Sequence, residues 1–434
     1  MKLKTVFACQ NCGYQTGKWL GKCPSCNEWN TFVEDVINVG KEEVTRHTRL
    51  GNAEKPQNIE INSPTKPRIK TGIAEFDTVL GGGIVESSLI LLSGEPGIGK
   101  STLTLQVVDR MAGLIDPQKT VLYVTGEEAI EQVADRAKRL GLKQKNISLL
   151  YETSVENIIT AIDNEKPAFL VVDSIQVLTS QDIAGTAGSL SQVRYATEIL
   201  MNEIKTRKIP LLLIGHVNKE GNIAGPKVLE HLVDTVLLLE GERDHELRML
   251  RALKNRFGPV SEIGLFEMTS EGMCEVKNPG ERVLANRPQN TIGSALTISM
   301  EGNRPFLMEV QALVSQTTFG YPKRMASGFD RNRLELLIAV LQKHNKMNLM
   351  DQDVYINVAS GMHLNDPSAD LAVCMAIASS FYGKAIPRNE VVFGEVGLTG
   401  EIRSSFKDNE RQKSAQKMGL TTKTITHLTK LTLP

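Results

Sequence analysis

Short apolar runs separated by longer amphipathic stretches make up the middle of the chain, from Ile69 to about Glu275. Such runs are typical of strands buried on both faces of a parallel sheet, and the stretches between them have the periodicity of helices. The runs are Leu89–Leu92, Val121–Val124, Phe169–Val172, Leu211–Ile214 and Val236–Leu239. Strands and helices that alternate in this way predict an α/β domain of the nucleotide-binding kind.

The pattern changes on both sides of this region. The chain up to residue 35 is rich in cysteine and poor in apolar residues, and a polar stretch without periodicity follows it. After a joint rich in Pro and Asn, a second α/β region has strand-like Ala295–Met300 and Leu307–Val314 and helix-like Arg331–Lys343 and Ala369–Phe381. We therefore predict a small domain (1–35), a linker (36–66), the α/β domain (67–277) and a second α/β domain (278–434).

Composition and charge narrow the function classes. The 434 residues allow about three domains at about 150 residues each, and 41% hydrophobic with 23% charged residues excludes a mostly disordered chain. The 50 basic and 50 acidic residues cancel, so any contact with nucleic acid must be local. No run of 18 apolar residues occurs, and we expect a cytoplasmic protein without a membrane partner.

Two Cys-x2-Cys pairs lie in the first domain. They are formed by Cys9, Cys12, Cys23 and Cys26. Each pair can supply two thiolates to one shared tetrahedral Zn²⁺. A zinc site closed by four thiolates has no open position and is structural. Trp19 and Trp29 would give the site apolar cover. Two disulfides are the alternative, which a reducing compartment disfavours.

A phosphate-binding motif follows the first apolar run. The segment matches GxxxxGK[ST] between a strand and a helix, the context in which backbone amides cradle phosphates at a helix N-terminus. Lys100 would reach the β and γ oxygens of ATP, and Ser101 would hold Mg²⁺. The predicted nucleotide contacts are Gly94, Glu95, Pro96, Gly97, Ile98, Gly99, Lys100, Ser101 and Thr102.

Carboxylates end two further runs. Asp173 follows Phe169–Val172, at the Walker B position that holds Mg²⁺ beside the phosphate loop. Glu127 and Glu128 follow the second run, where one carboxylate would orient the attacking water, and we favour Glu127. The alternative is that both glutamates cap the next helix. His216 follows the fourth run, either as a sensor of the γ-phosphate or as a buried structural histidine.

The segment Lys254-Asn255-Arg256-Phe257-Gly258 is a family signature. Alternation along an extended segment would send Lys254 and Arg256 to one face. With this KNRFG sequence, the cysteine pairs and the phosphate loop, nearly the whole chain resembles the RadA/Sms family of bacterial DNA-repair proteins.

This resemblance implies a RecA-like ATPase core, an N-terminal four-cysteine zinc finger and a Lon-protease-like C-terminal domain. It also implies a hexameric ring that binds single-stranded DNA and uses ATP to drive branch migration of D-loops beside the RecA recombinase. In such a ring, Lys254 and Arg256 could reach the nucleotide of a neighbouring subunit, as an arginine finger does, or could contact DNA.

The last domain resembles Lon around residues 365–370 and 393–402. Ser368 would correspond to the nucleophile, but Glu410 falls where the catalytic lysine belongs, and Lys407 and Lys413 lie one turn away on either side. Asp366 as a helix N-cap explains the segment equally well. Because a serine without a positioned base is not activated, we expect no proteolysis but a role in ring assembly and DNA contact. We also expect the last strand and helix of this domain to be missing after about Leu420.

The sequence therefore predicts a DNA-dependent ATPase with ATP, Mg²⁺ and Zn²⁺ as cofactors, acting in recombinational repair. Two alternatives stay open. One is a KaiC-like regulatory ATPase that binds protein partners and no DNA. The other is an active ATP-dependent protease that uses Ser368.

Overall fold

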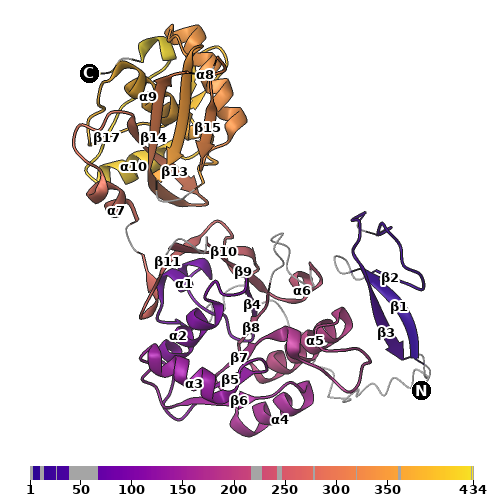
Figure 1. Ribbon diagram of the computed structural model, residues 1–434. Helices are drawn as coiled ribbons and strands as arrows, with labels where there is room; N and C mark the ends of the chain where they lie inside the picture. The colour runs from indigo at the N-terminus through magenta and orange to yellow at the C-terminus, as the bar shows by residue number, and fades with distance from the viewer. Residues whose placement is uncertain are drawn as a thin grey trace, which may run out of the picture. The chain divides into compact units, whose positions relative to one another are not determined.

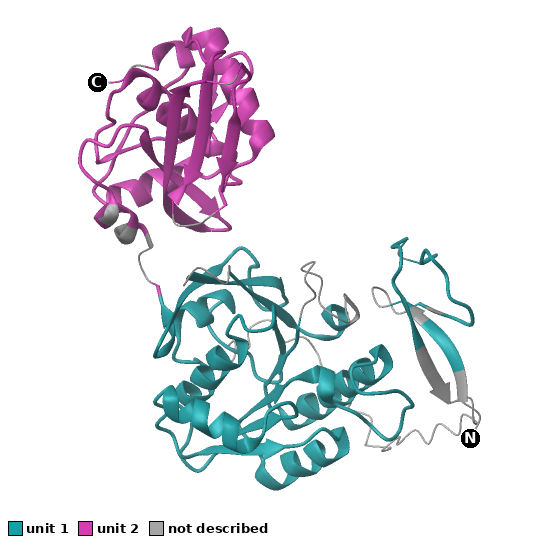
Figure 2. Ribbon diagram, in the orientation of Figure 1, with its two compact units in different colours: residues 1–275 teal, residues 276–434 magenta. Residues whose placement is uncertain are grey.

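A computed structural model divides the chain into two compact units, residues 1–275 and 276–434 (Figure 2). It describes residues 3–9, 14–25, 27–38, 67–216, 227–241, 247–276, 279–318, 320–359, 363–431 and 433. The two units meet at residues 275 and 276, two residues before the boundary that the sequence predicts.

The first described residues form a small antiparallel sheet. Strand β1 (Leu3–Cys9) lies between β2 (Gln15–Thr16) and β3 (Phe32–Asn38). Its apolar cluster consists of Cys9, Cys23 and Phe32 with Phe7 packed against them. A cluster of this size cannot stabilise a fold without a further cross-link. β3 continues to Asn38, so the first domain extends beyond its predicted end at residue 35.

A nine-stranded sheet forms the centre of the first unit, in the order β12-β11-β10-β9-β4-β8-β7-β5-β6 (Figure 1). Six adjacent strands are parallel. They are β4 (Leu89–Gly94), β5 (Val121–Thr125), β6 (Ile147–Tyr151), β7 (Phe169–Asp173), β8 (Leu211–Ile214) and β9 (Thr235–Glu240). The five predicted runs are the five inner strands. β6, which the sequence does not predict, is the edge strand, and its side chains are only partly buried.

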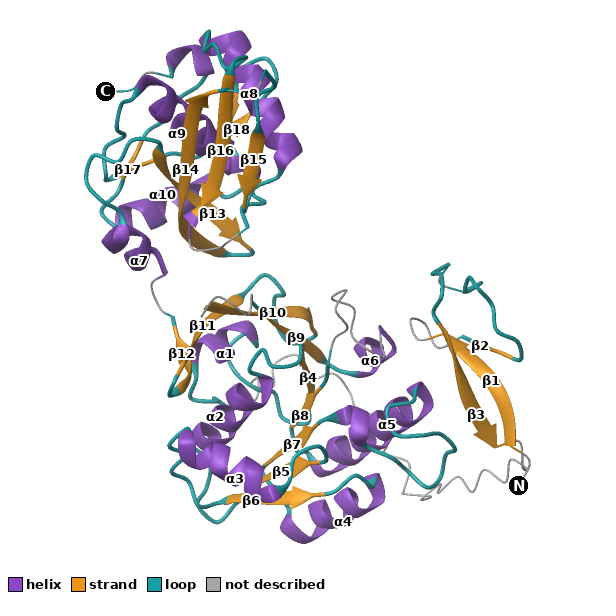
Figure 3. Ribbon diagram, viewed as in Figure 1, coloured by secondary structure: helices purple, strands orange, loops and turns teal. Residues whose placement is uncertain are grey.

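Helices cover both faces of this sheet (Figure 3). Alternate residues of each inner strand point to opposite faces. In β4, Ile90 and Leu92 pack with α1 (Ala74–Val79), α2 (Lys100–Ala112) and α3 (Ile130–Arg139). On the other face, Leu89 and Leu91 pack with α4 (Val155–Glu165), α5 (Leu190–Arg207) and α6 (Lys227–Leu232). Two cores explain why the strands are apolar throughout.

Three antiparallel strands extend the sheet beyond β9. They are β10 (Leu247–Asn255), β11 (Ile263–Thr269) and β12 (Gly272–Glu275). The pairing of β10 with β9 shifts register between Ala252 and Lys254. Side chains of this part of the sheet reach the phosphate loop, as described below.

The second unit has a six-stranded sheet in the order β15-β16-β14-β13-β17-β20. The strands are β13 (Ser294–Glu301), β14 (Arg304–Gln316), β15 (Arg324–Ser327), β16 (Gln352–Val358), β17 (Glu390–Val391) and β20 (Thr421–Thr422), with a separate pair β18 (Glu395–Val396) and β19 (Ile402–Arg403). The helices are α7 (Pro279–Asn286), α8 (Arg331–Asn345), α9 (Asp370–Tyr382) and α10 (Asp408–Lys417). Residues 370–379 of α9 are all buried, which makes it the central helix of this unit.

The α/β fold class predicted from the sequence is confirmed: a small three-stranded sheet comes first, a largely parallel sheet covered by helices follows, and a second α/β unit ends the chain. Within the described ranges, no helix has both the length and the apolar character that a membrane crossing requires.

Candidate active site

The phosphate loop connects β4 to α2. Gly97 and Gly99 have φ values of 80° and 113°, a region that side chains other than glycine rarely adopt. A Cβ at Gly99 would also lie 2.5 Å from the Met268 methyl group of β11. Glu95, Pro96 and Gly97 are exposed. These exposed residues lie just before the N-terminus of α2, the positive end of the helix, where anions bind.

Lys100 is held inside this loop. Only 4% of the residue is exposed, and its Nζ donates hydrogen bonds to the carbonyl oxygens of Gly94 (2.8 Å) and Glu95 (2.9 Å). Burial lowers the pKa of Lys100 to about 8, although the negative charges of Asp173 and Glu127 act in the opposite direction. A buried ammonium group that bonds only to neutral carbonyls is suited to exchange them for phosphate oxygens.

Asp173 ends β7 beside the loop. It accepts a hydrogen bond from the Tyr123 hydroxyl at 2.7 Å. Burial raises the pKa of Asp173 above its ordinary value, and hydrogen bonds from Tyr123 and Ser101 reduce that rise. A carboxylate and a hydroxyl in contact are the kind of oxygen ligands that Mg²⁺ takes, so the residues present fit this ion. Asp173 and Ser101 would hold this ion, which would supply positive charge against the phosphates.

The two glutamates after β5 face different partners. Glu127 accepts a hydrogen bond from the Ser174 hydroxyl and lies 3.6 Å from His216 Nε2. The contact with His216 contributes most to lowering the pKa of Glu127, against the effect of burial. Glu128 instead forms a 2.8 Å ion pair with Arg136 of α3. Glu127 is therefore an ionised carboxylate that faces Lys100 and His216. Glu128 faces Arg136 of α3 instead.

Lys254 and Arg256 both reach the segment that leads into β9. Lys254 Nζ donates to the carbonyl oxygens of Glu230 (2.5 Å) and Val233 (2.8 Å). Arg256 pairs with Asp234 at 2.9 Å. β10 ends at Asn255, and Arg256 lies in the turn that follows. Strand alternation is therefore not the only reason that both cations reach the segment before β9. The turn and the register shift in β10 contribute as well.

Two of the four predicted zinc ligands are described. Cys9 and Cys23 are both fully buried, and their amides donate to the carbonyls of Tyr14 (2.9 Å) and Glu28 (2.8 Å) in tight turns. Cys12 and Cys26 lie outside the described residues. Trp19 and Trp29 are 52% and 67% exposed, so they cover the cluster only in part. Two buried thiols from separate turns fit a tetrahedral thiolate site.

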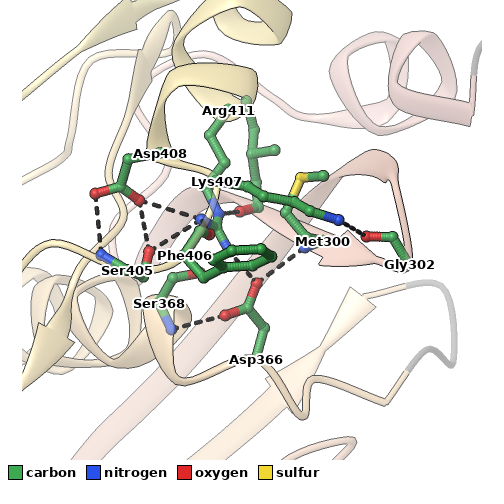
Figure 4. Close-up of polar contacts among 10 residues, drawn as sticks. Met300, Gly302, Asp366, Ser368, Ser405, Phe406, Lys407, Asp408 and Arg411 are labelled. Atoms are coloured by element: carbon green, nitrogen blue, oxygen red, sulfur yellow. Dashed lines mark hydrogen bonds and ion pairs between the residues drawn. The ribbon is translucent and has the colours of Figure 1, made fainter. Parts of the chain in front are cut away.

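In the second unit, Asp366 and Ser368, from the segment that the sequence analysis compared with Lon, lie near a buried arginine (Figure 4). Arg411 is 2% exposed, forms an ion pair with Asp366, and donates to the Ile298 carbonyl at 3.0 Å. Glu410, which the sequence placed at the position of the catalytic lysine, is exposed, and so is Lys413. Lys407 Nζ donates to the Gly302 carbonyl at 2.8 Å.

Asp366 also caps the turn that carries Ser368. Its carboxylate accepts from the Ser368 amide at 2.9 Å, with Pro367 in the first turn, as the N-cap interpretation requires. Ser368 is fully buried. The charged groups beside this serine segment are the Asp366 carboxylate and its partner Arg411, whose guanidinium stays protonated and cannot accept the hydroxyl proton.

Sequence reasoning missed several residues that position the site. Tyr123 lies within an apolar run and gives no separate signal. Ser174 directly follows Asp173, and a polar residue after a strand that carries a carboxylate could have been noted. Arg136 and Arg411 could not be found, because their partners are distant in the chain. Gln192 also gave no signal, although it holds the loop before α5 by donating to the carbonyls of Ile183 (2.8 Å) and Ser180 (3.1 Å).

A cavity of about 640 Å³ lies at the other edge of the same sheet, where β5, β7 and β8 begin. Ile69, Lys119, Lys166 and Pro210 are among its lining residues. None of the predicted site residues lines it, so it is separate from the phosphate loop.

The strand-loop-helix with its lysine, the carboxylate at the end of β7 and the parallel sheet define a P-loop ATPase of the RecA and KaiC class, joined to a zinc ribbon. Residues 69–149 match the KaiC ATPase family, and residues 7–34 match the rubredoxin metal-binding domain family of zinc ribbons.

Relatives cover almost the whole chain. The DNA repair protein RadA of Bacillus subtilis is 49% identical over 96% of this chain and 91% of its own length. The RadA proteins of Halalkalibacterium halodurans and Listeria monocytogenes are each 47% identical over the same shares. The chain belongs to the RadA family of DNA repair proteins.

Proposed function

We propose that this protein is a DNA-dependent ATPase and helicase of recombinational repair. It binds single-stranded DNA, promotes branch migration of D-loops alongside RecA, and works as a homo-oligomeric ring, most simply a hexamer. The observation that carries the proposal is the arrangement of Lys100, Asp173 and Glu127 at one edge of the sheet, in a chain related along its length to DNA repair proteins.

In this proposal, the loop and α2 bind ATP through the residues from Gly94 to Thr102. Lys100 holds the β and γ oxygens, and Ser101 with Asp173 holds Mg²⁺. Glu127 accepts the proton of the attacking water, because its lowered pKa keeps it ionised and its neighbours hold it toward the site. Glu128 has no catalytic part, since it is paired with Arg136.

Lys254 and Arg256 have different roles in the proposal. Arg256, whose side chain is 49% exposed, stabilises charge on a neighbouring subunit's nucleotide. Lys254 is tied to two carbonyls and stabilises the turn that presents Arg256. Direct contact of either cation with DNA is the alternative.

Zn²⁺ bound by Cys9, Cys12, Cys23 and Cys26 would be structural, and thiolate ligands need a reducing compartment such as the cytoplasm. For the second unit, we propose assembly and DNA contact without proteolysis. This is supported by the two lysines that flank Glu410 in the sequence: Lys413 is exposed and Lys407 is bound to the Gly302 carbonyl, whereas Ser368 is fully buried.

The test is the ATPase rate with and without single-stranded DNA, together with D-loop extension in the presence of RecA. We expect stimulation by DNA that weakens steeply with salt, because phosphate contacts release counterions. Lys100→Ala should abolish turnover. A rate that is indifferent to DNA at every salt concentration would favour the KaiC-like regulatory ATPase instead, and casein digestion that Ser368→Ala abolishes would favour the protease.

A further inference from the structure

We propose that Asp234 is a positioning residue that holds Arg256 and fixes it to the strand leading into the phosphate loop. The inference rests on the proposed role of Arg256 as a group that acts on nucleotide in a neighbouring subunit. It assigns to Asp234 the task of presenting that group in one orientation.

Asp234 is anchored to the first residue of β4. The residue is 5% exposed and lies directly before β9. Its Oδ2 accepts from the Leu89 amide at 3.1 Å, and its own amide donates to the Leu89 carbonyl at 2.9 Å. A carboxylate held by the backbone of a buried strand has little freedom to move.

The other carboxylate oxygen of Asp234 binds the arginine. Asp234 Oδ1 accepts from Arg256 Nη1 at 2.9 Å, and the Arg256 amide donates to the Asp234 carbonyl at 3.1 Å. A buried carboxylate needs a cation to compensate its lost hydration, and the guanidinium supplies it. Because Arg256 is half exposed, it can remain bound to Asp234 while the rest of its guanidinium faces outward.

Strand β10, which ends one residue before Arg256, also contacts the phosphate loop. Arg248, 6% exposed near the start of β10, directs its Nε to the Ile98 carbonyl of the phosphate loop at 3.3 Å. β10 and the turn after it are thus linked to the phosphate loop through Ile98 at one end, and to the start of β4 through Asp234 and Leu89 at the other. This arrangement ties the position of Arg256 to the strand and loop that bind the nucleotide.

The physical gain is preorganisation. A free arginine side chain loses rotamer freedom when it docks, and an anchored one has already lost part of it. Replacing Asp234 by Asn keeps the shape and an oxygen acceptor but removes the charge. Arg256 would then sample more orientations, while the loop, Lys100 and the magnesium ligands stay in place.

The experiment is a double-mutant cycle on the full-length protein, with DNA-stimulated turnover and affinity for a fluorescent ATP analogue as readouts. We expect Asp234→Asn to lower kcat about tenfold with unchanged nucleotide affinity, as the loss of an oriented group should. Once Arg256→Ala is present, Asp234→Asn should cause no further loss. Glu240→Gln is the matched control, since it breaks the 2.7 Å pair with Arg251 across the same two strands, β9 and β10.

Asp234→Glu separates positioning from packing. If charge is what matters, this variant keeps a higher rate than Asp234→Asn. If Asp234 only fills space, the extra methylene group of Asp234→Glu lowers the rate below that of Asp234→Asn, and the inference is overturned. Additive losses in the cycle, or weaker nucleotide binding by Asp234→Asn, overturn it as well. If Arg256→Ala alone keeps the full rate, the proposed role of Arg256 is wrong and the inference falls with it.

Discussion

At the scale of single residues, burial and neighbouring charge set the chemistry of the active site. Lys100, Asp173 and Glu127 are close enough to affect one another's protonation, yet their pKa values shift for different main reasons. Burial dominates for Lys100 and Asp173, while a specific contact with His216 dominates for Glu127. As a result, Glu127 stays ionised and can act as a base, whereas the ionised form of Asp173 needs a cation nearby.

The two glutamates after β5 should differ sharply in function. Glu127→Gln removes the carboxylate that faces Ser174 and His216, and we expect the ATPase rate to fall by about 10²-fold or more while ATP still binds. Glu128→Gln only weakens the pair with Arg136, so its rate should stay within a few-fold of the unsubstituted protein. A steady-state ATPase assay decides, and equal losses in both variants would contradict the assignment.

Lys100 should make nucleotide binding depend on pH. Its pKa of about 8 lies below the value in an unfolded chain, so the protonated form costs stability below pH 8 and the nucleotide-free protein gains stability as the pH rises from there toward 10.5. The negative charge of bound nucleotide phosphates should raise the pKa of Lys100 again, so that Lys100 takes up a proton when the nucleotide binds. Titration calorimetry in buffers of different ionisation enthalpy should show uptake of about half a proton per nucleotide at pH 8 and almost none at pH 6.5. Equal uptake at both values would refute the lowered pKa.

At the scale of elements, the second unit depends on contacts between segments that are distant in the chain. Arg411 of α10 joins β13, through the Ile298 carbonyl, to the turn before α9, through Asp366. Burial alone would raise the pKa of Asp366, but hydrogen bonds from Met300, Ser368 and Arg411 bring it below its ordinary value. The unfolded chain therefore binds more protons in acid, and this contribution to stability is lost as the pH falls through the folded-state pKa.

Arg411→Ala should destabilise the second unit strongly. It leaves the Asp366 side chain, which is only 11% exposed, without its cation, and losing one partner of such a pair costs about 3–5 kcal/mol. Hydrogen exchange measured by mass spectrometry should show lost protection in β13 and α10, with the nucleotide-binding unit unaffected. Arg331→Ala is the control, because its pair with Glu335 on α8 is exposed and should change protection little. Unchanged protection in Arg411→Ala would contradict the bridging role.

At the scale of the whole molecule, the chain consists of parts with separate cores. The ATPase sheet has an apolar core on each face, the second unit is built around α9, and the ribbon has a cluster of only a few side chains. Stability is therefore distributed unevenly, and the ribbon depends most on a cross-link.

Removal of zinc should unfold the ribbon alone. Both tryptophans of the chain, Trp19 and Trp29, lie in it, so tryptophan fluorescence reports on this part only. A strong chelator, or Cys23→Ser, should shift that fluorescence and abolish the bound zinc, while affinity for an ATP analogue is retained. Loss of nucleotide binding together with zinc would show that the parts do not fold separately.

Much of the ATPase fold follows from the chain alone, because its inner strands are buried on both faces and thus apolar throughout. The edge strand β6 and strand β10 are only partly buried, which leaves a weaker pattern, and neither they nor the short antiparallel strands β11 and β12 were among the predicted runs. The phosphate loop is contiguous in sequence, and so is the KNRFG signature. Glu127 was favoured over Glu128 from position, and the contacts with Ser174 and Arg136 supply a physical reason for that choice.

The sequence by itself determined the classes of chemistry: a phosphate loop, two carboxylates at strand ends and two cysteine pairs, each readable because its residues lie within a few positions of one another. Only the tertiary structure decided which partners these groups have. Asp234 meets Leu89 and Arg256 across a sheet, and Arg411 meets Asp366 across a domain. Such pairings depend on how strands and helices are ordered in space, which local periodicity does not encode.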